Sequence, residues 1–249
     1  MKTLIIFIVT LLSFVLRPLD TPNHVDGYYE DDHFIIVRVD PETSNIITCY
    51  KNADGEVINN FSRLKKHITS TGHELIFACN GGMFMEDLRP LGLYVEKGRQ
   101  IMPLNTRSAS TNFYIKPNGV FYILSNGSVG ICRTEAYELI SGLYAIGEDV
   151  KYATQSGPML TIDGLINGKF NINSTSYKHR NGVGINQDGD VIFIISKAPV
   201  SFYEFADAFL MVGCANSLFL DGDISDFYYP PEGLGWWYGY MSVFIAVVK

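Results

Sequence analysis

The side chains best suited to chemistry follow or precede apolar segments with strand character. Asp221 comes directly after the apolar segment 217–220, where a carboxylate would leave the end of a strand with part of its hydration removed. Partial desolvation makes a carboxylate a useful base or nucleophile, although an acidic turn is the alternative interpretation. Arg180 precedes another apolar segment, and its planar guanidinium matches the paired oxygens of a carboxylate or phosphate. A structural salt bridge is the alternative for Arg180.

Two further segments carry groups that could bind a substrate. In Asn80-Gly81-Gly82 the paired glycines follow a strand and could turn backbone amides toward an anion; a plain tight turn is the alternative. In Gln155-Ser156-Gly157 we interpret Gln155 and Ser156 as hydrogen-bonding groups that orient a substrate. Ser156 lacks the G-x-S-x-G context of serine hydrolases, so a nucleophilic serine is disfavoured.

The acidic residues Asp221, Asp223 and Asp226 could suggest a calcium site. The EF-hand spacing, with Gly at the sixth position and Glu at the twelfth, is absent, so we expect no metal. The segment Asn80-Gly81-Gly82 also lacks the Gly-Lys-Ser/Thr element of a P-loop. We therefore expect no cofactor.

The elements that must position these groups are mostly short strands, rich in β-branched or aromatic residues and bounded by turn formers. The predicted strands are 33–39, 45–50, 74–79, 91–96, 112–116, 120–124, 159–162, 183–186, 191–196 and 217–220. The turns 117–119 and 187–190 carry hairpin signals.

Helices are few in the predicted pattern. Ser201–Val212 has one apolar face, a capping box from Ser201 and Glu204, and Gly213 as a stop. Further helices are expected over 57–68 and 134–140. The pattern predicts an α+β fold with mixed β-sheets and a few covering helices in a single domain.

Composition limits the class of protein. The 249 residues are 47% hydrophobic and carry a formal charge of −7, which allows a large core and disfavours a nucleic-acid partner. An anionic ligand must therefore be held by local cations or backbone amides. Four cysteines form no C-x-x-C pair, and three complete disulfide pairings are possible among Cys49, Cys79, Cys132 and Cys214.

The N-terminus predicts export. Lys2 precedes the apolar run 3–16, and Arg17 follows it. Residues 1–17 are interpreted as a signal peptide or N-terminal anchor, 18–31 as a linker and 32–249 as the domain. We expect the protein to be periplasmic, secreted or anchored at the outer face of the membrane, with possible membrane attachment through this segment.

Taken together, seven segments between about residues 78 and 228 resemble, in order, the phosphodiester glycosidase domain family (mannose-6-phosphate uncovering enzyme-like), and more narrowly its bacterial exported branch. The matching segments are Asn80–Phe84, Pro90–Val95, Asn112–Tyr114 with Lys116–Val120, Ala153–Leu160, Arg180–Gly184, Pro199–Ala206, and Gly213-Cys214 with Asn216 and Leu220-Asp221-Gly222. Many relatives read Asp-Gly-Gly with Ser following, whereas this chain has the more acidic run Asp221-Gly222-Asp223-Ile224-Ser225.

The resemblance implies a hydrolase that cleaves the sugar C1–O bond of a sugar-1-phosphodiester. It places the active site around Asn80, Ser156, Gly157, Arg180 and Asp221, with Ser225 as the nearby hydroxyl. We expect Asp221 to act as nucleophile or base and Arg180 as the phosphate clamp. The alternatives are a non-catalytic envelope module that binds a glycan or cell-wall polymer, and a protease-inhibitor or scaffold protein that needs no convergence of these side chains.

Overall fold

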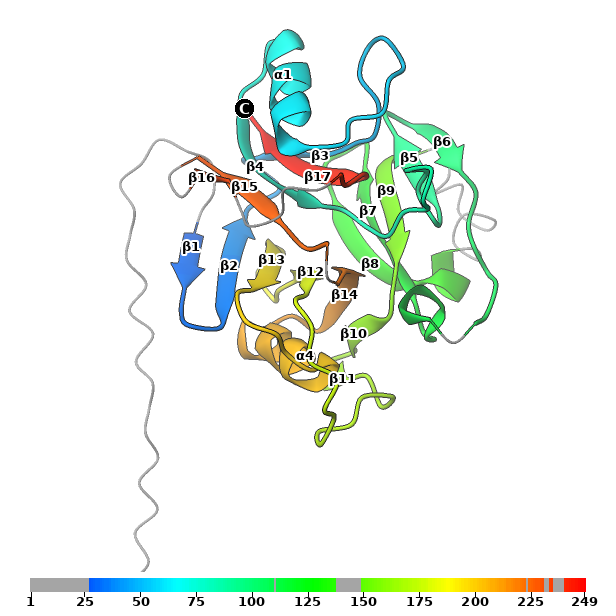
Figure 1. The fold of residues 1–249 in the computed structure, drawn as a ribbon, viewed down its shortest axis with the longest axis vertical. Helices are drawn as coiled ribbons and strands as arrows, with labels where there is room; N and C mark the ends of the chain where they lie inside the picture. Colours follow the sequence, from blue (N-terminus) through cyan, green and yellow to red (C-terminus); the bar gives the residue numbers. More distant parts are fainter. Residues whose placement is uncertain (1–26, 110, 138–148, 223, 231–232, 235–239) are drawn as a thin grey trace, which may run out of the picture.

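The computed structural model describes residues 27–109, 111–137, 149–222, 224–230, 233–234 and 240–249. Three antiparallel sheets account for most of this structure (Figure 1). The first sheet has the order β1-β2-β13-β12-β14-β10-β11, with β1 Gly27–Glu30, β2 Phe34–Val39, β10 Met159–Ile162, β11 Leu165–Ile166, β12 Asn181–Ile185, β13 Val191–Ser196 and β14 Asn216–Asp221.

The second sheet has the order β16-β15-β4-β17-β3, with β3 Asn45–Cys49, β4 Leu75–Asn80, β15 Phe227–Tyr229, β16 Gly233–Leu234 and β17 Phe244–Val248. The third has the order β6-β5-β9-β7-β8, with β5 Tyr94–Glu96, β6 Arg99–Met102, β7 Gly119–Leu124, β8 Val129–Arg133 and β9 Val150–Ser156. All pairings among the described strands are antiparallel, which corrects the expectation of mixed sheets. The protein is mainly β with few helices.

One hydrophobic core is shared by all three sheets. Phe193 of the first sheet, Phe77 of the second and Phe121 of the third all belong to it and are completely buried. The rings of Phe77 and Phe193 lie 5.1 Å apart, centroid to centroid. Burying a side chain of this size contributes about 1.5–3 kcal/mol. This core fixes the three sheets relative to one another, and with them the strand ends.

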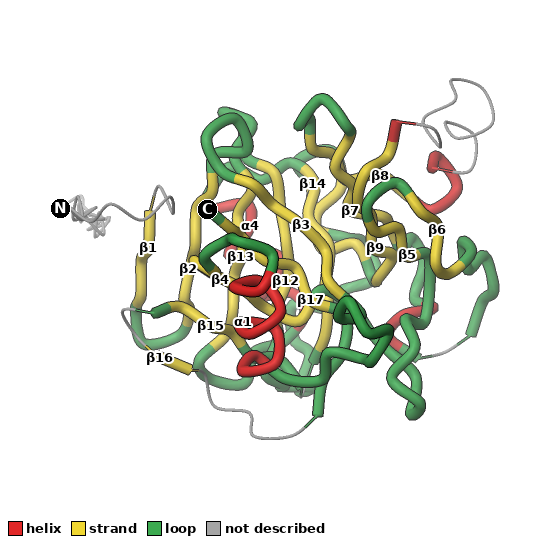
Figure 2. Tube along the Cα trace, turned by 90° about the horizontal axis from the view of Figure 1, so that it is seen from above, coloured by secondary structure: helices red, strands yellow, loops and turns green. Residues whose placement is uncertain are grey.

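Two helices cover the outer faces of two sheets (Figures 1 and 2). Helix α4, Phe202–Met211, packs Phe205 and Phe209 against the first sheet. Its predicted capping box between Ser201 and Glu204 is present, and Gly213 follows the helix with φ +82°. Because glycine adopts this φ without strain, the predicted stop is confirmed.

Helix α1, Phe61–Ser70, covers the second sheet, and its Phe61 ring lies 5.4 Å from that of Phe244. It begins later than the predicted residue 57, because the Asn60 side chain caps it by accepting the Arg63 N–H at 2.8 Å. In the predicted helix 134–140, residues 134–137 are helical and the remainder lies outside the described residues.

The structure corrects three sequence expectations and confirms a fourth. The predicted strand 112–116 is instead the 3₁₀ helix η1, Asn112–Tyr114, so the turn 117–119 joins no hairpin; β7 pairs with β8 and β9. The predicted turn 187–190 does join β12 to β13. Residues 27–30 of the predicted linker form β1, which pairs with β2 and extends the first sheet.

The described cysteines are all free thiols; Cys49, Cys79 and Cys214 are buried and Cys132 is half-buried. Among the described residues, no helix is long and apolar enough to cross a membrane. The predicted signal peptide or anchor, residues 1–17, lies outside the described residues.

Candidate functional site

A β-bulge at the end of β14 decides where Asp221 points. In the pairing with β12, Asn181 lies opposite Asp221 and Gly182 opposite Phe219, so Leu220 is the extra residue. Strict alternation would place Asp221 on the same face as Phe219, which packs with helix α4. The bulge breaks that alternation, and Asp221 instead faces strand β4 of the second sheet.

The Asp221 carboxylate is held by hydrogen bonds from two sides. Its Oδ2 accepts from Asn80 Nδ2 at 3.0 Å, and its Oδ1 accepts from the Gly222 N–H at 2.7 Å. Asn80 ends β4 and is completely buried, whereas Asp221 is half-buried. A fixed carboxylate that keeps partial exposure at a strand end is suited to act on a bound molecule.

Asn181 ties the two sheets together at this point. Its Nδ2 donates to the backbone oxygen and to Oδ1 of Asn80, both at 2.8 Å, and its Oδ1 accepts the Asp221 N–H at 2.8 Å. Segments far apart in sequence therefore meet in one hydrogen-bonded cluster, which we call the Asp221 cluster: Asn80, Asn181, Asp221 and Ser225.

Ser225 closes the turn that follows Asp221. Its Oγ lies within hydrogen-bonding range of Asp221 O at 3.0 Å, of Asn181 Oδ1 at 3.4 Å and of the Gly222 backbone oxygen. A hydroxyl carries one proton, so three acceptors share a single donor. Ser225 is buried, and its described contacts make it a turn-holding hydroxyl. Nearby Asp226 is also buried, with Oδ1 accepting the Phe227 N–H at 2.9 Å.

Arg180 lies beside the Asp221 cluster but on the other face of the first sheet. It precedes Asn181, so its side chain leaves the strand toward α4, and it is only 1% exposed. The guanidinium carbon sits 3.7 Å from the centroid of the Phe202 ring, and Nε donates to Val200 O at 2.9 Å. The described contacts thus bring Asn80, Asn181, Asp221 and Ser225 together and place the guanidinium of Arg180 on the helix side of the same sheet end.

Tight packing explains the paired glycines after Asn80. A Cβ on Gly81 would lie 2.8 Å from Ile245 Cγ1, and one on Gly82 would lie 2.8 Å from Thr154 Oγ1. The Gly81 N–H donates to the Val243 carbonyl, and Gly81 O accepts from Thr154 Oγ1 at 2.8 Å. The Gly81 amide is therefore used inside the protein, where the sequence had suggested an anion cradle.

Gln155 and Ser156 are the last residues of β9, and Gly157 follows the strand. This segment supports the Asp221 cluster from the third sheet. The Gln155 Oε1 accepts the N–H groups of Leu93 and Asn105 at 2.9 and 2.8 Å. Its Nε2 donates to Asn105 O at 2.9 Å and to Thr134 Oγ1 at 3.0 Å. These four bonds fill the capacity of the amide, so Gln155 holds the segment around Asn105 in place.

Ser156 and Gly157 are likewise internal. Ser156 is completely buried, and its Oγ donates to Leu220 O at 2.9 Å, directly before Asp221. A Cβ on Gly157 would lie 2.4 Å from Asn118 Cβ, which accounts for the glycine. Both residues therefore shape the backbone that carries the carboxylate.

Sequence reasoning missed Asn181. It lies inside the segment that Arg180 brought to notice, but an asparagine at a strand start reads as turn chemistry. What marks Asn181 as a site residue is its burial, at 1% exposure, and the sequence does not show that burial. The described residues contain no group of three His, Cys, Asp or Glu side chains arranged to hold a metal ion.

Comparison with known proteins gives matches at three levels. A family model described as phosphodiester glycosidase matches residues 73–233. The Escherichia coli K12 protein YigE, described as uncharacterised, is 38% identical over 199 residues, which cover 80% of this chain and 75% of YigE.

Two solved structures share the fold. The catalytic domain of zebrafish N-acetylglucosamine-1-phosphodiester alpha-N-acetylglucosaminidase, auto-inhibited by its pro-peptide, aligns with a TM-score of 0.59 and 15% identity over 89% of this chain and 80% of that one. A hypothetical protein from Synechocystis aligns with a TM-score of 0.52 and 14% identity over 89% of this chain and 61% of that one.

Proposed function

Because this chain belongs to the phosphodiester glycosidase family, we propose that it hydrolyses the bond between the anomeric carbon of a sugar and a phosphate diester, with Asp221 as the reacting carboxylate. The observation that carries this proposal is the Asp221 cluster, in which hydrogen bonds from Asn80 and Gly222 fix a half-buried carboxylate at the strand end. The family supplies the reaction class, and the cluster supplies the reacting group.

Cleavage at the anomeric carbon passes through an oxocarbenium-like transition state, which a nearby carboxylate stabilises. Asp221 acts either by attacking that carbon or by removing a proton from the attacking water. The Asn80 amide and the Gly222 N–H fix the plane of the carboxylate, so the group is oriented before substrate arrives. Orientation of this kind lowers the entropic cost of reaching the transition state.

The departing phosphate monoester is a good leaving group, so stabilisation of its charge matters more than proton donation. We assign part of that stabilisation to the positive charge of Arg180, which acts from the helix side of the sheet without contacting the phosphate. The guanidinium is enclosed by Phe202 and backbone carbonyls, and a charge in such surroundings is screened less than an exposed one. The positive charge of Arg180 can therefore stabilise the negative charge of the departing phosphate from the helix side of the sheet.

Two substitutions separate the charge of Arg180 from its packing. Arg180→Lys keeps the positive charge and loses the planar stacking on Phe202, whereas Arg180→Met keeps the apolar volume and loses the charge. Turnover should survive better in the lysine variant. Equal turnover in both variants, at temperatures where both are folded, would exclude the charge as the contribution of Arg180.

The first experiment is turnover of a panel of sugar-1-phosphodiesters, with release of free reducing sugar as the readout. The name of the zebrafish relative makes an N-acetylglucosamine-1-phosphodiester one member, and other hexoses and other groups on the far side of the phosphate complete the panel. We expect one class of substrate to be turned over by the native chain and not by Asp221→Asn. Binding without turnover in both proteins would favour the non-catalytic envelope module.

A further inference from the structure

A cleft of about 700 Å³ opens at the end of the shared core that lies away from the Asp221 cluster. Strand β12 starts at Asn181 in that cluster and ends at Ile185 in the cleft. Four steps along an extended strand of about 3.3 Å each separate the two by roughly 13 Å. Strand β9 joins the same two places in the opposite direction, from Lys151 in the cleft to Ser156 near Asp221. The cleft and the Asp221 cluster are therefore separate sites on the molecule.

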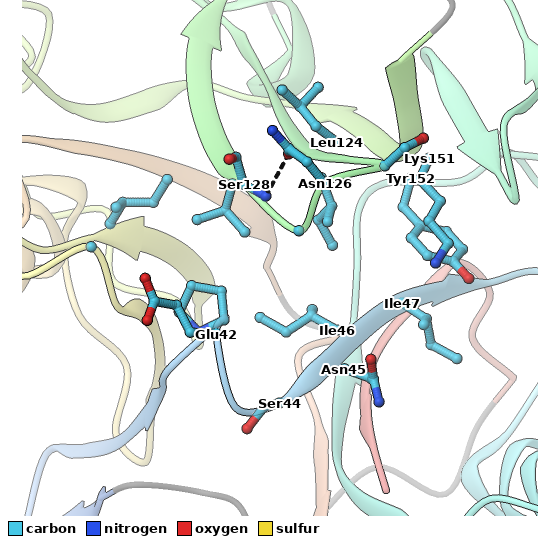
Figure 3. A pocket seen from close by; sticks show the side chains of 17 residues that line it. Glu42, Ser44, Asn45, Ile46, Ile47, Leu124, Asn126, Ser128, Lys151 and Tyr152 are labelled. Carbon is cyan, nitrogen blue, oxygen red and sulfur yellow. Dashed lines mark hydrogen bonds between the residues drawn. The ribbon is translucent and has the colours of Figure 1, made fainter.

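The walls of the cleft are preformed turns (Figure 3). In the turn before β3, the Glu42 N–H donates to Asp40 Oδ1 at 2.8 Å and the Ser44 N–H donates to Asp40 O at 3.0 Å. At the tip of the β7–β8 hairpin opposite, the Ser128 N–H donates to Asn126 Oδ1 at 3.0 Å. A ligand would meet an ordered surface and would not have to order either wall, which favours affinity.

The floor of the cleft is apolar and its rim is polar. Ile46, Ile123 and Tyr152 form the floor, are at most 6% exposed and belong to the shared core. Asn126 and Ser128 of the β7–β8 hairpin stand exposed on the rim. Ligand pockets in proteins have volumes of roughly 300–1,000 Å³ and combine an apolar lining with a few polar groups. This cleft has both properties.

The charged side chains that line the cleft limit the kinds of ligand that it can bind. Among the described lining residues the charged side chains are Glu42 and Lys151, which cancel. A phosphate or carboxylate ligand is held best by several donors of one sign, which this cleft lacks. A wholly apolar ligand would remove water from the amide and hydroxyl rim without replacing its hydrogen bonds, which costs free energy. A neutral ligand with both apolar faces and hydroxyl groups meets both conditions.

We propose that this cleft is a second binding site, for a neutral glycan segment. The C–H faces of the sugar rings pack on Ile46, Ile123 and Tyr152, and their hydroxyls bond to the Asn126 amide and the Ser128 hydroxyl. The Glu42 carboxylate accepts from hydroxyl groups at the rim. This site needs no chemistry at Asp221, so it holds whether or not the chain turns over a phosphodiester.

The isoleucines supply the test. Ile46, Ile47, Ile123 and Ile185 line the cleft, whereas Ile245 packs next to Gly81 near the Asp221 cluster. We would label isoleucine methyl groups with ¹³C and titrate the full chain with maltotetraose, tetra-N-acetylchitotetraose and glucose 1-phosphate. The cleft isoleucines should shift and saturate with a neutral tetrasaccharide, and the Ile245 signal should stay in place. The same shifts should persist in Asp221→Asn.

A matched pair of variants completes the experiment. Ser128→Trp fills the cleft from its exposed rim, and Ser62→Trp places the same bulk on the exposed face of α1. The first should weaken binding by at least about tenfold, the effect of losing one contact of ordinary strength, and the second should not. The proposal is overturned if millimolar tetrasaccharide moves no cleft isoleucine, if both variants bind equally, or if glucose 1-phosphate alone binds.

Discussion

Replacing Asn181 tests how the carboxylate is held. Its side chain makes 2.8 Å hydrogen bonds to Asn80 O, to Asn80 Oδ1 and to the Asp221 N–H. Asn181→Ala removes all of them and leaves polar atoms of Asn80, which is completely buried, without these partners. The change acts on both sheets at once, because Asn80 ends β4 and Asp221 ends β14.

The loss of stability in Asn181→Ala follows from the number of buried polar groups that lose a hydrogen-bond partner. Leaving one buried donor or acceptor unsatisfied costs about 1–3 kcal/mol. Local shifts recover part of the loss, so we expect the free energy of unfolding to fall by about 2–4 kcal/mol. A misplacement of about 1 Å costs about 10²-fold in rate, so kcat should fall by about that factor in the folded variant.

Asn186→Ala is the matched control. Asn186 directly follows the other end of β12, and its side chain also makes three hydrogen bonds, to the N–H groups of Asp188 and Asp190 and to Asp190 Oδ2. Urea unfolding followed by circular dichroism should show both variants destabilised. Initial rates on a sugar-1-phosphodiester, measured where both are folded, should fall only for Asn181→Ala. Unchanged kcat in that variant, or equal losses in both, would refute the positioning argument.

Three further predictions concern charge, packing and thiol chemistry. Arg180→Ala should lower turnover by about tenfold, the effect of about 1.4 kcal/mol on the barrier, and more than Ser225→Ala, as measured by reducing-sugar release at matched stability; similar losses would count against an electrostatic role for Arg180. Gly81→Ala should reduce the free energy of unfolding by about 1–3 kcal/mol in thermal melts, because its Cβ would lie 2.8 Å from Ile245 Cγ1; an unchanged melting temperature would contradict this packing. Burial raises the pKa of the Cys214 thiol to about 12, so little thiolate exists at neutral pH and a thiol reagent should label Cys214 only after unfolding; rapid labelling of the folded protein would disagree.

Local sequence signals predicted the elements that depend on local chemistry. The capping box of Ser201 and Glu204 fixed helix α4, and the turn 187–190 joined β12 to β13 as expected. Strand β17, Phe244–Val248, was not predicted, because a short apolar run does not show whether it lies between two strands, here β3 and β4. The predicted strand 112–116 failed because its aromatic residues favour β structure, yet the chain there forms a 3₁₀ turn.

The candidate site was predictable in its residues and less so in their directions. Asp221 and Asn80 were singled out from their places after apolar strands, and the structure brings their side chains to 3.0 Å. Which face Asp221 points to depends on the Leu220 bulge, and a one-residue insertion in a ladder has no local signature in the sequence. Arg180 faces helix α4 because it precedes Asn181, and the direction of Asn181 is set by contacts with Asn80 on another sheet, which the sequence does not show.

The bond that is broken tests the central claim most directly. Hydrolysis of a sugar-1-phosphodiester by the native chain in water enriched in ¹⁸O, followed by mass spectrometry of both products, shows which atom the water attacked. Attack at the anomeric carbon, as proposed for Asp221, places the label in the anomeric hydroxyl of the released sugar and leaves the phosphate unlabelled. Label in the phosphate would mean cleavage of the phosphorus–oxygen bond and would contradict the account.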